Sequence, residues 1–308
     1  MTASITSRFL DLRALSALEH MRFATRHRIE GAFSGRHQSR QQGGAGEFVD
    51  FREYTGAEDL RRLDWKVYAR TGKAFVRLHQ DETTLRCVLA VDATGSMRFG
   101  GRTRDHAGSK LGAGSKLEYV QYLATALSHV ITRGQDQVGL AVLDGGLREA
   151  IPPGGTQSHA GRVQEAIERL ETHPATTLAP GLHALFEQSP RRGVLLLLSD
   201  FLLDDLTDVF AALRLFRHRN WEVVVLHVVH PDEERLPDGT AYRFDGMEGD
   251  GHVHCSPSEI REAYQRLFAD HLAAVRQLAL AGGCDYRHVS TATTYLATLG
   301  GFLVERAG

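Results

Sequence analysis

The feature that most limits the possible folds is a series of short apolar runs that alternate with amphipathic helical stretches. The run at residues 194–198 is uninterrupted, which is typical of a strand buried on both faces in a parallel sheet. Further strands are expected at residues 85–91, 137–143, 148–151, 222–228 and 286–289, and helices at about 115–130, 158–170, 182–186, 205–219, 256–280 and 293–304. This alternation predicts an α/β fold: a doubly wound, mostly parallel, Rossmann-like sheet flanked by helices on both faces.

The composition is that of an ordinary globular protein. With 308 residues the chain can bury a sizeable core, and its formal net charge of −2 gives no argument for nucleic acid or an anionic membrane as a partner. The longest apolar run is far shorter than the roughly 20 residues that span a bilayer, so no membrane insertion is expected. The first thirty residues lack an apolar secretory segment, and the three cysteines are odd in number and widely spaced. We therefore expect a cytoplasmic protein with reduced thiols.

The first 84 residues differ in pattern from the rest, and we expect them to form an N-terminal module ahead of an α/β domain at residues 85–308. The module is expected to contain an amphipathic helix at about 10–30, a loop rich in Gly, Ser and Arg at 31–46, a charged and aromatic segment at 47–72, and a strand at 74–80. The loop at 34–46 is a hypothetical contact for a partner because of its charge; a plain solvated connection is the alternative.

One predicted strand runs directly into polar residues, in the sequence V-L-A-V-D-A-T-G-S-M at positions 88–97. Asp92 offers a carboxylate, and Thr94 and Ser96 offer hydroxyl groups at every second position. Ligands of open α/β sheets bind beyond the carboxyl ends of the strands, where these residues are expected. A few oxygen ligands of this kind suit Mg²⁺, which retains several waters. The same residue types also form ordinary turns, so the motif alone leaves both interpretations open.

A second strand end and one loop could complete such an oxygen site. Asp200 follows the apolar run at 194–198, and a loop with Thr176 and Thr177 precedes the helix that leads into that run. Both threonines are candidate hydroxyl ligands, and the spacing from the following helix favours Thr176. Thr156, in contrast, is expected to begin an earlier helix and to take no part in the site.

These residues resemble two known patterns. The D-A-T-G-S element, a loop threonine and a strand-end aspartate resemble the metal-ion-dependent adhesion site of von Willebrand factor A-like domains, whose usual first element is D-x-S-x-S. The upstream segments E-F-V-D-F-R-E-Y, D-L-R-R-L-D-W and A-R-T-G resemble the bacterial family called "domain of unknown function fifty-eight", and this similarity covers nearly the whole chain. The resemblance implies that Asp92, Thr94, Ser96, Thr176 and Asp200 hold Mg²⁺ or another divalent cation. Thr94 departs from the usual serine but keeps the hydroxyl group.

The resemblance also implies a function. In such domains the metal bridges to a carboxylate of a partner, which implies metal-dependent protein binding rather than catalysis. The bacterial family is commonly associated with MoxR-type AAA+ ATPases. An adaptor role beside such an ATPase is therefore expected, in the assembly or maturation of protein complexes, with a client that the sequence does not identify.

An enzyme is the alternative. An aspartate at a strand end can be the nucleophile of a magnesium-dependent phosphotransferase or phosphatase, and Asp92 has that position. The motif of such enzymes has a second aspartate where this chain has Thr94, and the upstream segments fit no enzyme of that kind. The binding module is therefore the preferred interpretation.

Two further motifs are weaker. His252, His254 and Cys255 form a cluster that could bind zinc, with a plain hairpin as the alternative. Lys110 and Lys116 lie in or beside a Gly- and Ser-rich insertion, but no phosphate-loop motif is present there. We expect that segment to be a solvent-exposed loop beside the metal site.

Overall fold

The computed structural model describes residues 7–25, 37–39, 47–54, 63–100, 114–236, 238–239, 241–249 and 251–307. The chain divides into two compact units. The larger one, the sheet unit, comprises Met1–Phe23 and Arg86–Gly308, and the smaller one comprises Ala24–Leu85. Residues on both sides of the small unit therefore contribute to the sheet unit.

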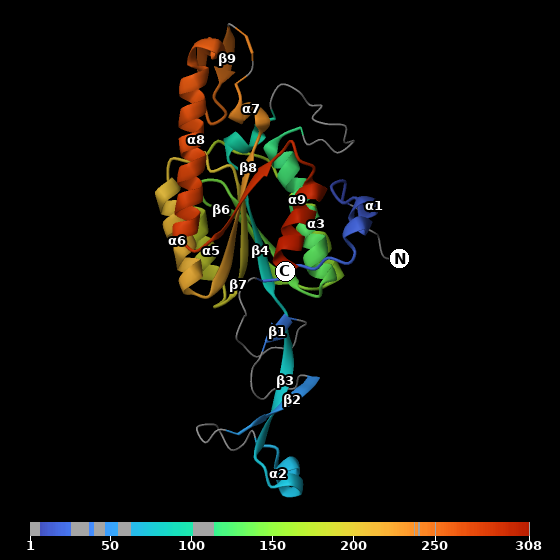
Figure 1. Ribbon diagram of the computed structural model, residues 1–308. Helices are drawn as coiled ribbons and strands as arrows, with labels where there is room; N and C mark the ends of the chain where they lie inside the picture. The colour runs from blue at the N-terminus through green and yellow to red at the C-terminus, as the bar shows by residue number, and fades with distance from the viewer. Residues whose placement is uncertain are drawn as a thin grey trace. The chain divides into compact units, whose positions relative to one another are not determined.

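The sheet unit contains a six-stranded sheet with the strand order β11-β8-β7-β4-β5-β6 (Figure 1). Its strands are β4 (Arg86–Asp92), β5 (Gln137–Leu143), β6 (Leu147–Gly154), β7 (Gly193–Ser199), β8 (Trp221–Val229) and β11 (Asp285–Ser290). All neighbouring strands are parallel except β5 and β6, which pair antiparallel at one edge. This arrangement confirms the predicted doubly wound, mostly parallel α/β sheet.

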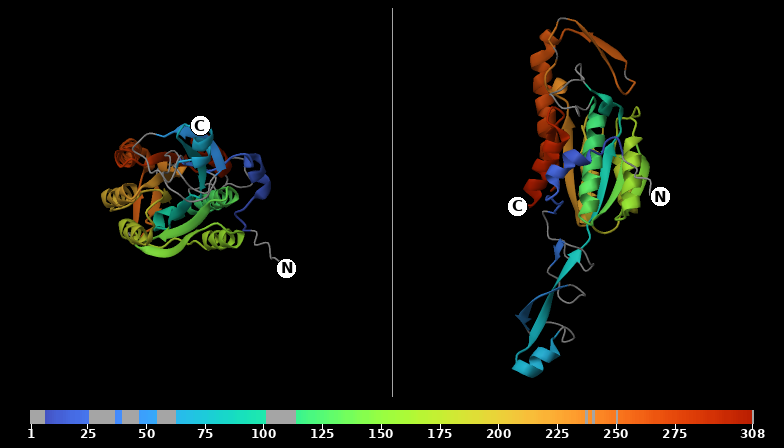
Figure 2. Two further views of the ribbon diagram at one scale, coloured as in Figure 1. Left: turned by 90° about the horizontal axis from the view of Figure 1, so that it is seen from below. Right: turned by 90° about the vertical axis from the view of Figure 1, so that its right-hand side faces the viewer.

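Helices cover both faces of this sheet (Figures 1 and 2). One face carries α3 (Lys116–Arg133), α4 (Gln157–Glu168) and α9 (Tyr295–Ala307), and the other carries α5 (Ala179–Gln188), α6 (Leu206–His218) and α8 (Pro257–Ala281). The connection from β4 to β5 uses α3, whereas the connection from β7 to β8 uses α6 on the opposite face. Right-handed crossovers that run in opposite directions along a sheet require helices on opposite faces, as observed.

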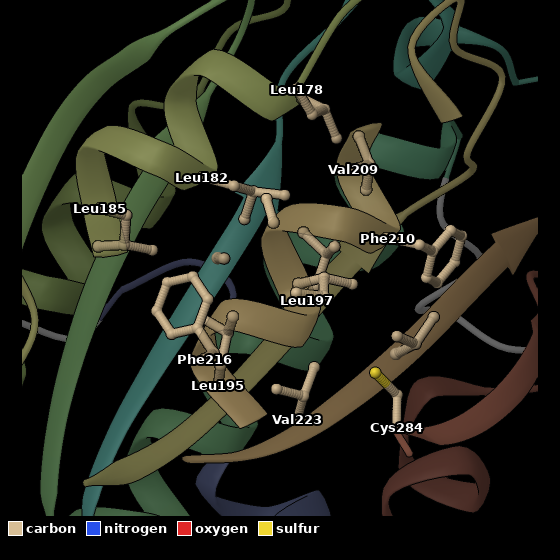
Figure 3. Close-up of a cluster of buried hydrophobic side chains, with 14 of the residues drawn as sticks. Leu178, Leu182, Leu185, Leu195, Leu197, Val209, Phe210, Phe216, Val223 and Cys284 are labelled. Atoms are coloured by element: carbon tan, nitrogen blue, oxygen red, sulfur yellow. The ribbon is translucent and has the colours of Figure 1, made fainter. Parts of the chain in front are cut away.

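The side chains of the central strands alternate between two buried layers. Leu195 and Leu197 of β7 point toward α5 and α6, where they pack against Phe216 and its neighbours (Figure 3). Leu196 and Leu198 are equally buried but belong to the opposite face of the strand. Each leucine removed from water in this way contributes roughly 1.5–3 kcal/mol. The uninterrupted apolar run thus reflects burial on both faces.

The helix starts follow local capping chemistry. Ser115 caps α3, its Oγ accepting from the backbone N–H of Glu118 at 3.1 Å. The Glu118 carboxylate accepts from the N–H of Gly114, one residue before the cap. Thr156 caps α4, its Oγ1 accepting from the N–H of His159 at 3.1 Å, which confirms that this threonine begins an earlier helix.

The prediction of a long N-terminal helix at 10–30 is wrong for the residues that the structure describes. A four-residue helix, α1 (Leu12–Leu15), continues into one short 3₁₀ turn, η1 (Ser16–Leu18), and the described residues up to 25 are not helical. Arg133 of α3 explains the early end, because its Nη2 donates to the carbonyl of Leu18 at 3.0 Å and to that of Met21 at 2.8 Å. These bonds hold the carbonyls in an orientation set by α3 rather than by a continuing helix.

The small unit contains a three-stranded antiparallel sheet with the order β1-β3-β2. The strands are β1 (His37–Ser39), β2 (Glu47–Glu53) and β3 (Phe75–Thr83), of which β3 confirms the predicted strand and extends it. Asp64 caps the helix α2 (Trp65–Thr71), its Oδ1 accepting from the N–H groups of Lys66 and Val67. Most of the loop at 34–46 lies outside the described residues, so the hypothesis of a partner contact there stays a prediction.

Candidate functional site at the carboxyl end of the sheet

The chain order of the strands reverses beside β4. From β4 the chain moves to β5 on one side, and it later returns to β7 on the other side. Such a switch point leaves a crevice beyond the carboxyl ends of the two flanking strands. Val91 pairs with Leu198 across β4 and β7, so Asp92 and Asp200 follow directly at neighbouring strand ends. The sheet therefore brings these two predicted site residues together, and Asp92 also contacts Ser199, which lies 107 positions later in the sequence.

Asp92 is completely buried and is held by three hydrogen bonds. Its Oδ1 accepts from the backbone N–H of Thr94 at 2.9 Å and from the Thr94 hydroxyl at 2.6 Å, and its Oδ2 accepts from the Ser199 hydroxyl at 2.5 Å. All three donors are neutral. Burial, followed by the negative charge of Asp200, raises the pKa of Asp92 to about 7, and the hydrogen bonds only partly oppose this shift.

The two predicted hydroxyl ligands are adjacent. Thr94 Oγ1 lies 3.2 Å from Ser96 Oγ. Two neighbouring oxygen ligands of an octahedral Mg²⁺, each at about 2.1 Å from the ion, are about 3.0 Å apart. Because the Thr94 hydroxyl proton points to Asp92, the lone pairs of its oxygen stay available on the other side. The spacing and the donor type therefore fit a small divalent cation.

Lys116 supplies a buried counterion that sequence reasoning missed. Its ammonium Nζ lies 2.6 Å from Asp200 Oδ2 and also forms an ion pair with Glu233, and the lysine is fully buried. Burial alone would lower the pKa of Lys116, but the charges of Asp200 and Glu233 raise it. The prediction that this segment is a solvent-exposed loop is therefore wrong for Lys116. One feature of the sequence could have indicated this role: Lys116 directly follows the Ser115 cap, in the first turn of α3, which faces the site.

Asp200 and Glu233 respond differently to their surroundings. Burial raises the pKa of Asp200, but the charge of Lys116 overcomes this effect and leaves the value below its usual range. For Glu233, burial raises the pKa by more than the charge of Lys116 lowers it, so the pKa is raised. Glu233 belongs to the short helix α7 (Pro231–Glu234), and its Oε2 accepts from the backbone N–H of His230 at 2.8 Å. Lys116 thus ties the first turn of α3 to both β7 and α7.

The buried charges do not balance. Asp92, Asp200 and Glu233 carry three negative charges when ionised, and Lys116 carries one positive charge, which leaves a net charge of −2. His227 contributes no charge, because burial lowers its pKa to about 3. An uncompensated buried charge is costly, so the cluster must either take up protons, for which burial raises the pKa of Asp92 and of Glu233, or bind a cation.

The donor set defines what kind of cation could be held. No three His, Cys, Asp or Glu side chains among the described residues lie close enough together to hold a metal ion. A cation beside Asp92 and Asp200 would therefore depend on the hydroxyl oxygens of Thr94 and Ser96. Ligands that are all oxygen suit Mg²⁺ or a similar hard cation rather than zinc.

The third predicted hydroxyl, Thr176, lies on the neighbouring loop. The carbonyl of Thr176 accepts from the N–H of Asp204 at 2.9 Å, and that of Thr177 accepts from the N–H of Gly145 at 2.9 Å, so the backbone of both threonines is held by neighbouring segments. Thr176 lines a cavity of about 900 Å³ together with Ser96, and among the described residues Thr177 is not part of this lining. This placement favours Thr176 over Thr177 as the ligand, which stays a prediction.

A hairpin from another part of the chain closes one side of this cavity. It consists of β9 (Tyr242–Asp245) and β10 (His252–Cys255), the plain hairpin given above as the alternative to a zinc site, and lies with α7 at the end of the sheet unit where β4, β7 and β8 terminate (Figure 1). Between the two strands, Glu248 reaches the predicted metal ligands: its Oε1 accepts from the backbone N–H of Ser96 at 3.2 Å. Sequence reasoning did not identify Glu248, and nothing local in the sequence indicates this contact.

Residues 50–274, which include every predicted ligand, match the family described as "Protein of unknown function DUF58". The chain belongs to the DUF58 family. Three relatives, uncharacterised proteins from Mycobacterium bovis and two strains of Mycobacterium tuberculosis, are each 25% identical to this DUF58 protein over 300 residues. The matches cover 96% of this chain and 90% of each relative. The family resemblance inferred from the upstream segments is confirmed.

Two solved structures are distantly similar to this DUF58 chain. A conserved hypothetical protein, BatB, from Bacteroides thetaiotaomicron has a TM-score of 0.45 at 17% identity and covers 72% of this chain and 98% of its own. An aerotolerance-related membrane protein from Bacteroides fragilis has a TM-score of 0.44 at 16% identity, covering 71% and 98%. Among the described residues, no helix combines the length and apolar character needed to cross a membrane.

The arrangement in this DUF58 protein disfavours Asp92 as a nucleophile. Asp92 is fully buried. One of its carboxylate oxygens accepts a hydrogen bond from Thr94, and the other accepts one from Ser199. A nucleophilic carboxylate needs an oxygen that a substrate phosphorus can approach. The phosphotransferase interpretation therefore has no specific observation in its favour.

The histidines of the hairpin do not form a zinc site in the described part of the chain. The rings of His252 and His254 lie 5.3 Å apart between centroids, and both residues are exposed. Within the described residues no third ligand of a suitable type joins them. The plain hairpin is the interpretation that the structure supports.

Proposed function

We propose that this DUF58 protein is a cation-dependent protein-binding module. Asp92, Thr94, Ser96, Thr176 and Asp200 would hold Mg²⁺ or another divalent cation in the manner of a metal-ion-dependent adhesion site of a von Willebrand factor A-like domain. A carboxylate of a partner protein would complete the coordination. The observation that carries the proposal is the buried pair Asp92 and Asp200, whose cluster carries a net charge of −2 when all its carboxylates are ionised, beside two hydroxyls 3.2 Å apart.

Each residue has a distinct task in this proposal. Asp92 accepts the proton of the Thr94 hydroxyl and so turns the lone pairs of that oxygen outward. Asp200 stays ionised because Lys116 holds its pKa down, and it supplies negative charge at the next strand end. The bound cation supplies a positive charge at which an anionic group of a partner can be held. Thr94 replaces the usual serine without loss of the oxygen ligand.

The proposed partner is a MoxR-type AAA+ ATPase, with this chain as its adaptor in the cytoplasm. The support is the DUF58 membership together with a site suited to binding rather than to turnover. A carboxylate on the ATPase, or on a client that the ATPase remodels, would engage the cation. This step rests on the family resemblance rather than on the contacts of the site.

Titration with Mn²⁺, followed by calorimetry, tests the metal site directly. The wild type should bind one ion, Thr94→Ala should bind it at least ten-fold more weakly, and Thr94→Ser should bind it like the wild type because it keeps the hydroxyl. Failure of the wild type to bind Mn²⁺ or Mg²⁺ would overturn the proposal.

A second experiment tests the partner. The tagged chain is mixed with a purified MoxR-type ATPase of the same cell, with Mg²⁺ or with EDTA, and Asp92→Ala serves as the variant without a site. We expect capture by the wild type in Mg²⁺ and loss of capture in EDTA or with Asp92→Ala. Equal capture under all conditions would exclude metal-dependent binding of this partner.

A further inference from the structure

A carboxylate of the chain itself lies against the predicted metal-ligand loop. Glu248 Oε1 accepts from the backbone N–H of Ser96 at 3.2 Å, across 152 residues of sequence. Ser96, Thr176 and Glu248 line one cavity, so the acidic side chain borders the same space as two of the predicted ligands. Glu248 is half-buried there.

The backbone on both sides of this contact is closely packed. A Cβ atom added at Gly95 would lie 2.4 Å from the carbonyl oxygen of Met247 and 2.9 Å from Cγ of Glu248. Only glycine permits this approach, because real Cβ atoms do not come within 3.0 Å of a backbone oxygen. The loop that carries Glu248 therefore fits directly against the residue between the two hydroxyl ligands.

The hairpin gives Glu248 a defined position. Residues Tyr242–Asp245 pair antiparallel with His252–Cys255, and the loop is closed by a hydrogen bond from Gly246 N–H to the carbonyl of Gly251 at 2.7 Å. In the sheet unit, α8 follows this hairpin and begins at Pro257. Met247 and Glu248 thus sit at the tip of a short, internally bonded element.

Charge decides what a third carboxylate can do here. When Asp92 is ionised, the cluster of Asp92, Asp200, Glu233 and Lys116 is negative, so another carboxylate is repelled unless a cation lies between them. With a cation bound, the same side chain becomes a suitable oxygen ligand. The proposed site leaves one coordination position for a carboxylate, and Glu248 is the carboxylate that the fold brings to the Ser96 loop.

We propose that Glu248 is this chain's own ligand for the open position of the cation, and that a partner carboxylate must displace it. The inference rests on the proposed function, because it requires the cation. It makes the β9–β10 hairpin a competitor of the partner and gives the site a closed and an open form. Removal of the Glu248 carboxylate should therefore weaken cation binding and at the same time admit a free carboxylate.

Acetate and Mn²⁺ test this without any knowledge of the partner. A carboxylate bound to Mn²⁺ shows strongly enhanced relaxation of its methyl protons, which NMR measures in the presence of the protein. Glu248→Ala should bind Mn²⁺ about ten-fold more weakly than the wild type, and acetate relaxation per bound Mn²⁺ should rise several-fold. Glu248→Gln, which preserves the side-chain volume, should behave in the same direction.

Asp245→Ala is the matched control. Asp245 belongs to the same hairpin and lines the same cavity, but its Oδ1 accepts from Arg243 Nε at 2.7 Å rather than from the Ser96 loop. This variant should match the wild type in Mn²⁺ affinity and in acetate relaxation. Equal behaviour of all four proteins, with Mn²⁺ bound, would overturn the role of Glu248 and leave the proposed function intact. A wild type that binds no Mn²⁺ would overturn both proposals.

Discussion

The ammonium nitrogen of Lys116 lies 2.6 Å from the Oδ2 atom of Asp200, and both side chains are almost completely shielded from water. This ion pair joins the first turn of α3 to the carboxyl end of β7 across 84 residues of sequence. It fixes the charge state of Asp200 and leaves Asp92, at the neighbouring strand end, without a positively charged partner among the described residues.

Replacement of Lys116 by methionine should lower the free energy of unfolding by about 3–5 kcal/mol, because Asp200 and Glu233 would keep their buried charges without a counterion. Urea denaturation in EDTA measures the change. Arg169→Met is the control: it removes an exposed pair with Glu165, so a change within about 0.5 kcal/mol is expected. Equal, small effects of both substitutions would show that the buried ion pair stabilises the fold no more than the exposed one does.

The stability contributed by Asp92 should fall as the pH rises. Its pKa is about 7 in the folded chain and 3.8 in an ordinary aspartate, so between these values the folded state retains a proton that the unfolded state has lost. Ionisation in the folded chain therefore costs stability from about pH 4 to about pH 7. In EDTA, urea unfolding of the wild type relative to Asp92→Asn should show a difference that decreases from pH 5 to pH 8.

Magnesium should reduce this loss, because the cation stabilises the ionised form of Asp92. The difference between wild type and Asp92→Asn at pH 8 should shift in favour of the wild type when Mg²⁺ is added. A difference that is independent of pH, or that increases from pH 5 to pH 8 in EDTA, would contradict the raised pKa.

The loop threonines should differ in their effect on the cation. Thr176→Ala removes a hydroxyl from the cavity that Ser96 also lines, and we expect Mn²⁺ affinity to fall about ten-fold or more. Thr177→Ala removes the same group one residue away and should leave the affinity within about two-fold. Calorimetric titration of both variants decides between them, and the reverse order of effects would assign the ligand role to Thr177.

A single methyl group at Gly95 should separate the hairpin from the metal-ligand loop. In Gly95→Ala the new Cβ would collide with backbone at Met247, and we expect a loss of about 1–3 kcal/mol together with faster amide exchange at residues 246–249. Gly161→Ala, in α4, meets no atom within 4 Å and should be neutral or slightly stabilising. Hydrogen exchange with mass spectrometry measures both. Unchanged exchange in Gly95→Ala would show that the close approach is not maintained in solution.

Local patterns in the sequence were sufficient for most of the sheet unit. The strand predicted at 137–143 is β5, and the threonine expected to begin an earlier helix does cap α4. Asp92, Thr94 and Ser96 could be placed at one sheet edge because strand alternation and the strand end are properties of neighbouring residues. Asp200 joined them by the general rule that parallel strands end at the same edge.

The tertiary structure decided which charges are compensated and which helices end early. The helix predicted at 10–30 ends at Leu18, because the guanidinium of Arg133 donates hydrogen bonds to the carbonyls of Leu18 and Met21. Lys116 pairs with Asp200, 84 positions later in the sequence. Glu248 accepts a hydrogen bond from Ser96, 152 positions earlier. No periodicity or spacing encodes such pairs, because a hydrogen bond or ion pair depends on the distance between atoms in space, and that distance is fixed only when the whole sheet and its helices have packed.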